Sequence, residues 1–323
     1  MRRVLFVGLA VLTLATTTRG EVSIVQERLS VDALTWAKCR WQQTRYTGLT
    51  NSYFDFYRPT AFVGLTGHIS SVTLMRLYCD VSDLSGQLLY DLYVDFHWPS
   101  GIELRAGQFK PPLGFEALTN PYELKLVDRS LVARKWKPWN PRDVGIMVSY
   151  GSSQFEVAGA LVNGNGIGQG YEDNNDWKDV CGRVVLKPLA HHGLKFACRG
   201  YYGRIDEAGL RFRNLAGEFL LERPPLQVVA EVQHAVQGGC TRNSFYVQAS
   251  FKFFGLLEPV ARFQMEFQSE DKYDFGVTGG LNFLVLGDRL KVMLDYNHSR
   301  RKSITAQNRV SQRTVSLQLQ AAI

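Results

Sequence analysis

Basic side chains are concentrated in one long segment, residues 110–142, and the chemistry that they offer is anion binding. Seven Lys or Arg residues stand here against three carboxylates. Ammonium and guanidinium groups at a narrow point of a pore attract anions and replace part of their hydration shell. We expect this segment to fold into a pore and to present cations there: Lys110, Lys125, Arg129, Arg134 and Lys135. The alternative is that it folds outward as a surface lid.

Further basic residues recur on the polar face of segments that alternate apolar and polar side chains. If the apolar face of each segment meets lipid, this polar face lines an aqueous lumen. The predicted lumen residues on these segments are Arg58, Arg76, Arg105, Arg199 and Arg262. Carboxylates share the face, and we expect many of these charges to pair across neighbouring strands.

Patterns for covalent or metal chemistry are missing from the sequence. There is no Gly-x-Ser-x-Gly nucleophile elbow, the six histidines lack metal-ligand spacing, and the five scattered cysteines form no Cys-x-x-Cys pair. We therefore expect no catalysis, no metal and no cofactor.

The elements that must position the basic residues are strands of about ten residues with a period of two. In the segment 244–253, Phe245, Val247 and Phe251 share one face, while Tyr246 and Gln248 share the other. Each such segment is long enough to cross a membrane as a tilted strand. Sixteen strands are predicted, at 34–43, 56–67, 71–80, 87–97, 101–109, 143–150, 153–162, 176–188, 193–203, 208–221, 225–235, 242–253, 258–268, 274–284, 288–299 and 310–321.

Connection lengths favour a closed membrane barrel. Outer-membrane barrels alternate short periplasmic turns with longer outside loops. Short connections are predicted after every even-numbered strand, whereas long ones fall at 44–55, 110–142, 163–175 and 300–309. The predicted fold is an all-β transmembrane antiparallel barrel of about sixteen strands. The tenth strand, 208–221, needs a bulge to keep its alternation in phase.

The N-terminus has the organisation of a secretory signal peptide. Arg2 and Arg3 precede an apolar run from Val4 to Thr18, and Thr18-Arg19-Gly20 forms the expected cleavage site. We expect residues 1–20 to be removed and residues 21–323 to form the barrel. Without Arg2, Arg3 and Arg19 the chain keeps 34 basic and 30 acidic residues. That excess is too small to indicate nucleic-acid binding.

Three segments around the long connection resemble the phosphate-selective porin O/P family. They are Glu103–Glu116 (ELRAGQFKPPLGFE), Leu126–Leu131 (LVDRSL) and Arg142–Gly145 (RDVG). The resemblance implies a trimeric channel of sixteen strands with Lys and Arg along the path of an anion. By position in the motif it marks Arg105, Lys110 and Arg129.

We therefore expect an outer-membrane porin that lets small anions, phosphate or other oxyanions among them, diffuse passively. Its expected partners are these anions, outer-membrane lipid and lipopolysaccharide, and two further copies of the chain in a homotrimer, without nucleic acid. Two other functions stay open: an exported soluble β-rich binding protein, and a plugged outer-membrane barrel with a structural or adhesive role.

Overall fold

The computed structural model describes residues 22–25, 28–46, 49–82, 88–135, 142–164, 166, 175–204, 210–268, 272–303 and 309–323. The expected signal peptide, residues 1–20, lies outside the described residues. None of the helices in the described part has the length and hydropathy that crossing a membrane requires.

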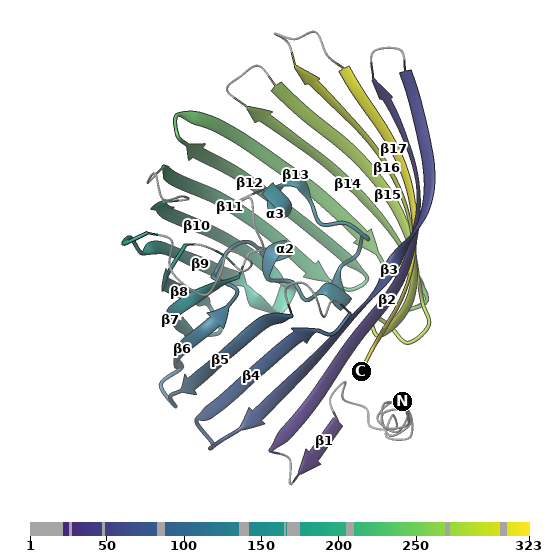
Figure 1. The fold of residues 1–323 in the computed structure, drawn as a ribbon. Helices are drawn as coiled ribbons and strands as arrows, with labels where there is room; N and C mark the ends of the chain where they lie inside the picture. Colours follow the sequence, from purple (N-terminus) through teal and green to yellow (C-terminus); the bar gives the residue numbers. More distant parts are fainter. Residues whose placement is uncertain are drawn as a thin grey trace.

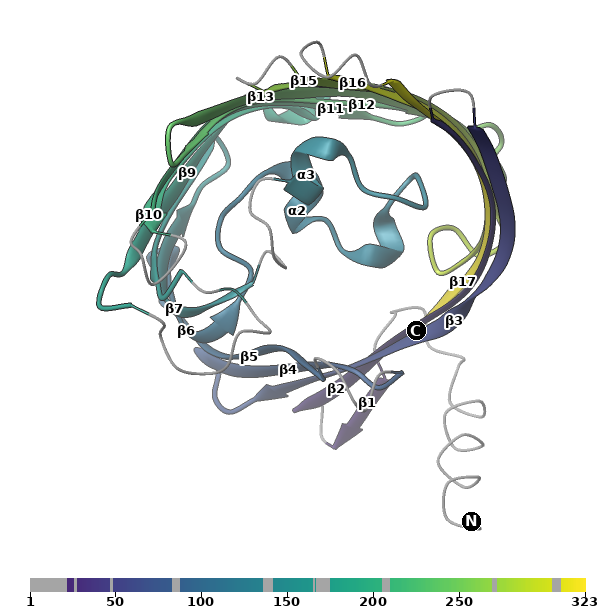
Figure 2. The same ribbon diagram turned by 45° about the horizontal axis from the view of Figure 1, so that its top comes forward.

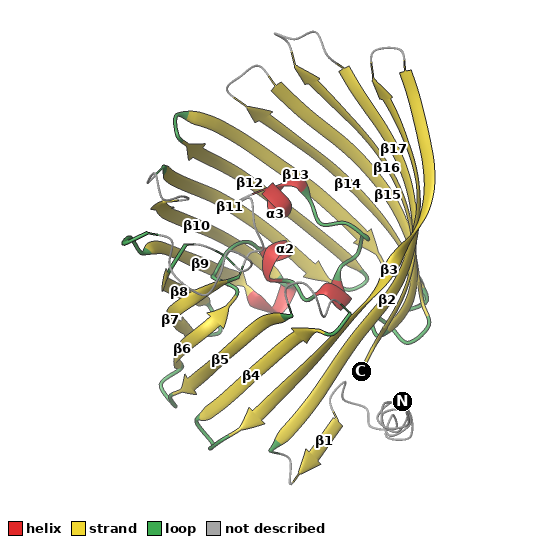
Figure 3. Ribbon diagram, in the orientation of Figure 1, coloured by secondary structure: helices red, strands yellow, loops and turns green. Residues whose placement is uncertain are grey.

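Sixteen strands of the described chain form one closed antiparallel barrel, as the alternation predicts (Figures 1 and 3). Each strand pairs with the next along the chain, and β17 pairs with β2 to close the ring, joining Ala322 to Leu34. A short additional strand, β1 (Val22–Val25), pairs with the start of β2. The strands of the ring are β2 (Leu29–Tyr46), β3 (Leu49–His68), β4 (Thr73–Asp80), β5 (Leu89–His97), β6 (Ile102–Phe109), β7 (Asp143–Gly151), β8 (Phe155–Val162), β9 (Asp179–Leu189), β10 (Leu194–Arg204), β11 (Arg211–Arg223), β12 (Leu226–Gln237), β13 (Cys240–Phe251), β14 (Leu257–Gln268), β15 (Lys272–Leu284), β16 (Leu290–Ser303) and β17 (Arg309–Ala322).

Burial along the strands is inverted relative to a soluble protein. On β13, Tyr246, Gln248 and Ser250 are buried, whereas Val247 and Phe251 are exposed. A strand presents alternate side chains to opposite faces, so the polar set faces the lumen and the apolar set faces outward. A soluble β-rich protein would bury the apolar set, so this pattern excludes that alternative.

The two ends of the barrel differ in the length of their connections. The seven connections at one end, here called the turn end, have two to five residues, as predicted, and the C-terminus lies beside them. The opposite end, the loop end, carries the long segment between β6 and β7. In outer-membrane barrels the short turns face the periplasm and the longer loops face outside.

Two expectations about the strands are wrong. The predicted long loop 44–55 is a hairpin instead, because β2 and β3 stay paired up to Tyr46 and Leu49. The predicted bulge in the tenth strand is missing: β11 pairs with β10 and β12 without a register shift. This strand begins at Arg211 rather than at residue 208, so no extra residue disturbs its phase.

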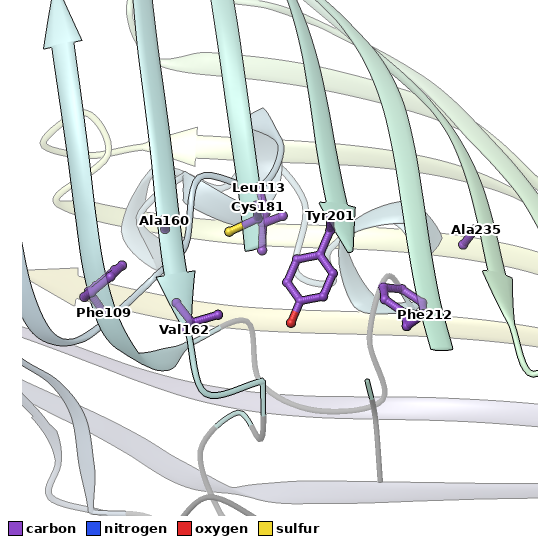
Figure 4. Packing of buried hydrophobic residues seen from close by; sticks show 8 residues of the cluster. All are labelled: Phe109, Leu113, Ala160, Val162, Cys181, Tyr201, Phe212 and Ala235. Carbon is purple, nitrogen blue, oxygen red and sulfur yellow. The ribbon is translucent and has the colours of Figure 1, made fainter. Parts of the chain in front are cut away.

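An apolar cluster covers the lumen wall of β8 to β12 near the loop end (Figure 4). Leu113, which follows β6, packs against side chains of this wall that include Val162, Cys181, Tyr201 and Phe212. Cys181 is buried on the lumen side, while Cys198 is exposed on the outer side. The cluster gives the long segment an apolar surface on which to enter the barrel.

Candidate functional site

The described residues of the segment between β6 and β7 lie inside the barrel (Figure 2). Its described part contains three short helices, α2 (Phe115–Leu118), η1 (Pro121–Glu123) and α3 (Leu131–Lys135). Residues 136–141 lie outside the described residues. We call the described part, residues 110–135, the lumen loop.

Side chains of the wall satisfy the backbone of the lumen loop. Lys291 of β16 donates to the carbonyl oxygens of Tyr122 and Leu124, both at 2.8 Å. Asn282 of β15 donates to the Lys125 carbonyl at 2.9 Å. Irregular backbone inside a barrel needs such partners, because an unpaired buried peptide group is costly. The polar lumen faces of β15 and β16 therefore hold the loop against their side of the barrel.

A second set of contacts clamps the two ends of the lumen loop together. The Glu116 carboxylate accepts from the Ser130 backbone N–H at 2.8 Å and from Arg262 of β14 at 3.2 Å. Arg262 also donates to the Asp128 carbonyl at 2.8 Å, and the Glu116 N–H donates to Glu231 of β12 at 3.0 Å. These groups are almost fully buried. We call Glu116, Ser130, Glu231 and Arg262 the loop clamp.

The motif residue Arg129 also holds the lumen loop in its conformation. Its guanidinium donates to the carbonyl oxygens of Glu116 and, at 2.8 Å, of Thr119, which lie in the same loop. Burial lowers the pKa of Arg129 from its ordinary value, although Glu116 opposes the shift. Arg129 therefore ties the lumen loop to itself rather than facing open water.

The opposite side of the lumen is open. A cavity of about 1070 Å³ lies between the lumen loop and the wall formed by β2 to β6. Five basic and five acidic side chains line it: Arg76, Arg105, Lys110, Arg142 and Arg289 against Asp32, Asp91, Asp95, Glu123 and Asp288.

Three arginines that line this cavity are each held by one carboxylate. Arg105 bonds Asp95 through two nitrogens, both at 2.7 Å. Arg142 bonds Asp91 in the same forked way, at 2.7 and 3.1 Å. Forked pairs of this kind fix a guanidinium in place with high geometric precision.

The third arginine, Arg76, donates to both carboxylate oxygens of Asp32 and, at 2.7 Å, to the Thr66 hydroxyl. Gly64 leaves the space that this pair occupies, because a Cβ at that position would meet both side chains.

Aromatic rings support the same three guanidinium groups. Arg105 lies 3.9 Å from the ring centroid of Tyr93, Arg142 lies 4.8 Å from that of Tyr90, and Arg76 lies 5.4 Å from that of Tyr78. Ring faces attract cations, and Arg is the cation most often found there.

Asp91 and Asp95 of β5 bind Arg142 and Arg105, and Tyr93 between them is the register partner of Arg76 on β4, so the three arginines lie along β5. We call Arg76, Arg105 and Arg142 the arginine file.

Lys110 stands where β6 passes into the lumen loop. Its ammonium group lies 3.5 and 3.4 Å from the carbonyl oxygens of Leu118 and Thr119. Burial, together with the nearby Arg142 and Arg129 cations, lowers the pKa of Lys110 well below its usual value. Lys110 therefore links the cavity wall to the lumen loop.

Asp288, at the turn end of the cavity, is surrounded by lysines. Lys291, Lys125 and Lys252 lie 3.0, 3.1 and 3.6 Å from its carboxylate. Burial by itself would raise the pKa of Asp288, but Lys291 and Lys125 hold it below the usual value. The charge of this carboxylate is thus offset locally by cations.

The structure separates the ten predicted pore residues into groups. Arg76, Arg105 and Lys110 line the large cavity. On the loop side, Arg199 and Arg262 are buried and Arg129 is half-buried; Arg199 faces Glu218 and Glu231 at 3.2 and 3.7 Å. Lys125 pairs with Asp288 and Glu258.

The remaining three predicted residues lie elsewhere. Arg134 borders a separate cavity of about 250 Å³ near the loop end. Arg58 is exposed. It lies on β3 between Tyr57 and Thr60, which both pair with β2, at a point where the register of that pairing shifts. Lys135 ends α3, and its side chain lies outside the described part.

Sequence reasoning left one arginine of the cavity out of the predicted pore. Arg142 was counted among the basic residues of the long segment, and it belongs to the arginine file. Its partner Asp91 and the neighbouring Asp95 share the polar face of β5, which the alternation assigns to the lumen. Among the described residues no group of three His, Cys, Asp or Glu side chains could hold a metal ion.

Comparison with solved structures agrees with the barrel architecture. The chain is similar to the outer membrane channel DcaP of Acinetobacter baumannii, with a TM-score of 0.70 and 9% identity over 93% of this chain and 99% of that one. It is similar to the OprB protein of Pseudomonas putida, with a TM-score of 0.67 and 9% identity over 92% and 94% of the two chains. An anion-selective porin from Comamonas acidovorans gives a TM-score of 0.62 and 13% identity over 91% and 100%. Identities this low show a shared fold alone.

The family assignment comes from the sequence. No curated protein matches the chain. A family model described as phosphate-selective porin O and P matches residues 42–217, more than half of the chain, including the segments on which the resemblance was first noted. The chain therefore belongs to the phosphate-selective porin O and P family, whose members are outer-membrane channels rather than enzymes.

Proposed function

We propose that this porin conducts small anions, phosphate or other oxyanions among them, through the cavity between the lumen loop and β2 to β6. The arginine file is the observation that carries the proposal. It presents three fixed guanidinium groups to the cavity of about 1070 Å³ beside the loop.

Acidic and basic side chains that line the cavity are equal in number, so their number does not favour anions. The proposed preference for anions is supported instead by how these charges are arranged. A guanidinium has five N–H donors, and a forked pair with a carboxylate uses two of them. Arg105 therefore keeps three donors for a passing anion, while both oxygens of Asp95 already accept hydrogen bonds. The Arg105 side chain is 25% exposed and that of Asp95 only 4%. A solute in the cavity meets the cation more than the carboxylate.

The proposal extends to the surroundings of the barrel. Export by the signal peptide 1–20 would deliver the chain to the outer membrane, where its outer face contacts lipid and lipopolysaccharide. A homotrimer is the assembly that we propose; one similar structure is described as a trimer form, that of OmpT of Vibrio cholerae. The sector from β4 to β8 suits contact between copies, because both of its arginines, Arg76 and Arg105, line the lumen and its outer face is apolar.

A plugged barrel is the second candidate, and the extensive attachment of the lumen loop favours it. Wall side chains from β2, from β12 and from β14 to β17 hold the loop. A plugged barrel would give no ion current in a planar bilayer, whereas the cavity beside the loop favours a current.

Replacement of Arg105 by Gln tests the proposed path. Gln removes one cation from the cavity and leaves Asp95 without its counter-charge. A charge interaction at a hydrated site is worth about 1 kcal/mol. We therefore expect the anion-to-cation permeability ratio, read from the reversal potential in a salt gradient, to fall about fivefold.

Arg213 of β11 supplies the matched control. Its neighbour Asn214 accepts a hydrogen bond from the lumen residue Arg199, so Arg213 itself faces outward. Arg213→Gln removes the same charge outside the lumen and should leave the permeability ratio unchanged. Equal effects of the two substitutions would show that the cavity beside the loop is not the conducting path.

A further inference from the structure

Basic residues gather on the outer surface of β16 near the loop end. Asn297, Ser299 and Arg301 line a lumen cavity, and Arg301 pairs there with Asp274 at 2.9 Å. Alternate residues of a strand face opposite sides. The residues between and beyond them, His298, Arg300 and Lys302, therefore face outward.

Cation–ring contacts agree with this orientation. Arg300 lies 6.0 Å from the ring centroid of Phe275, its register partner on β15. Lys302 lies 5.9 Å from the ring centroid of Tyr273, which is the register partner of Lys302 on β15. Both rings thus stand beside the cations on the outer surface.

Strand pairing adds further cations at the same level. His298 pairs in register with Arg313 of β17, and Lys302 pairs with Arg309. Ser311, the partner of Arg300, pairs on its other side with Arg45 of β2. We call this set the rim patch: Arg45, His298, Arg300, Lys302, Arg309 and Arg313.

Carboxylates are missing from this surface within the described residues. The outward-facing positions of β15, β16, β17 and β2 carry no Asp or Glu, because the acidic residues of these strands, Asp32, Asp274 and Asp295, face the lumen. Arg300 donates at 3.2 Å to His298, another member of the rim patch, rather than to an acid. The rim patch is thus a cationic surface whose counter-charge does not come from the described wall.

The order of side chains along the outer face of β16 shows where the rim patch lies relative to the membrane boundary. Going from the turn end along the outer face of β16, Val292 and Leu294 come first, then Tyr296, and then the cations. Tyr296 aligns through Val315 with Trp41 of β2. Tyr and Trp mark the boundary between hydrocarbon and headgroups in membrane barrels. The rim patch follows that boundary, at the level where lipid phosphates lie.

We propose that the rim patch binds the phosphate groups of lipid headgroups in the outer leaflet. Guanidinium groups bind phosphate in forked pairs, and a lysine adds a point charge. The inference rests on the proposed place of the barrel in the outer membrane, but it is independent of which ions pass through the lumen.

A triple variant, Arg300→Gln, Lys302→Gln and Arg313→Gln, tests the proposal. The probe is fluorescently labelled lipopolysaccharide added to the detergent-solubilised full-length protein, with binding followed by fluorescence anisotropy. Each basic residue near an anionic lipid surface contributes about 1 kcal/mol. The triple variant should therefore bind the probe at least about tenfold more weakly than the unaltered protein.

Arg301→Gln is the control within the same strand. Arg301 is adjacent to Arg300 in the sequence but faces the lumen, so the control removes a charge from β16 without touching the rim patch. It should bind lipopolysaccharide as tightly as the unaltered protein. The reversal potential of the triple variant should also stay unchanged, which separates this inference from the proposed ion selectivity.

Three results would overturn the proposal. The first is equal lipopolysaccharide affinity of the triple variant and the unaltered protein. The second is equally tight binding of dephosphorylated lipopolysaccharide, or displacement of the probe by inorganic phosphate at matched concentration, because lipid phosphate would then not be the ligand. The third is a loss of oligomers in the triple variant, by light scattering, with lipid binding intact; the rim patch would then contact a second copy of the chain.

Discussion

Replacing Arg262 by Ala is expected to release the lumen loop and to raise the single-channel conductance. Arg262 is 3% exposed and holds both Glu116 and the Asp128 carbonyl. Removing one partner of a buried ion pair costs about 3–5 kcal/mol, because the other charge stays buried without compensation. This corresponds to a shift of roughly 100-fold or more from docked to released loop. Conductance steps in a planar bilayer should become larger and noisier.

The barrel itself should survive this substitution, because its strands pair with one another independently of the loop. Heat-dependent mobility in gel electrophoresis checks that the barrel is folded. Arg301→Ala is the comparison, since it breaks the lumen pair with Asp274, which does not involve the loop. Unaltered conductance in Arg262→Ala, with a folded barrel, would mean that the loop clamp does not hold the loop.

Replacing Gly145 by Ala is expected to destabilise the barrel. Gly145 of β7 pairs in register with Gly107 of β6. A Cβ at Gly145 would lie 2.1 Å from the Leu161 carbonyl oxygen and 2.8 Å from the Val162 Cα, both backbone atoms of β8. Backbone cannot move aside as a flexible side chain can, so the strands must separate. Overpacking of this kind costs about 1–3 kcal/mol.

Gly159 of β8 offers a control in the adjacent strand. A Cβ at this position meets no atom within 4 Å. Gly159→Ala should therefore leave the urea midpoint of unfolding in lipid vesicles close to that of the unaltered protein, while Gly145→Ala lowers it. If both variants unfold at the same midpoint, the close approach of β7 and β8 is not a constraint on this barrel.

The same glycine pair explains part of the family motif. Gly107 has φ of 130°, a conformation that strongly favours glycine, and a Cβ there would meet the Leu92 carbonyl oxygen. Gly107 begins the Gly-Gln-Phe-Lys run, and Gly145 ends the Arg-Asp-Val-Gly run. These two motifs thus flank the lumen loop. They bring β6 and β7 together at the point where the lumen loop leaves the barrel wall.

The strands of this barrel could be predicted from the sequence because lipid and water select side chains on alternate positions. Tyr246 and Val247 show why: one faces the lumen and the other faces outward, and the period of two carries over the whole strand. The hairpin at Tyr46 and Leu49 was missed because strands that extend beyond the membrane need no apolar face. Phe54 and Phe56 are apolar on one side, but both faces of that end of β3 are exposed.

The roles of the basic residues could not be predicted in the same way. Arg105 and Arg262 both lie on lumen faces, and the alternation along their strands does not distinguish them. The distinction arises because the lumen loop is held against β12 to β17, which buries Arg262 and leaves Arg105 beside the cavity. Which wall a loop contacts depends on pairings such as Lys291 with Tyr122, separated by 169 residues. Sequence periodicity carries no information at that range.

The most direct measurement is the reversal potential of the purified, unaltered protein in a planar bilayer under a salt gradient. The proposed function predicts stepwise currents with a reversal potential of the sign that anion permeation produces. A reversal potential of the opposite sign, or a folded, heat-modifiable barrel that passes no current, would contradict an anion channel beside the lumen loop.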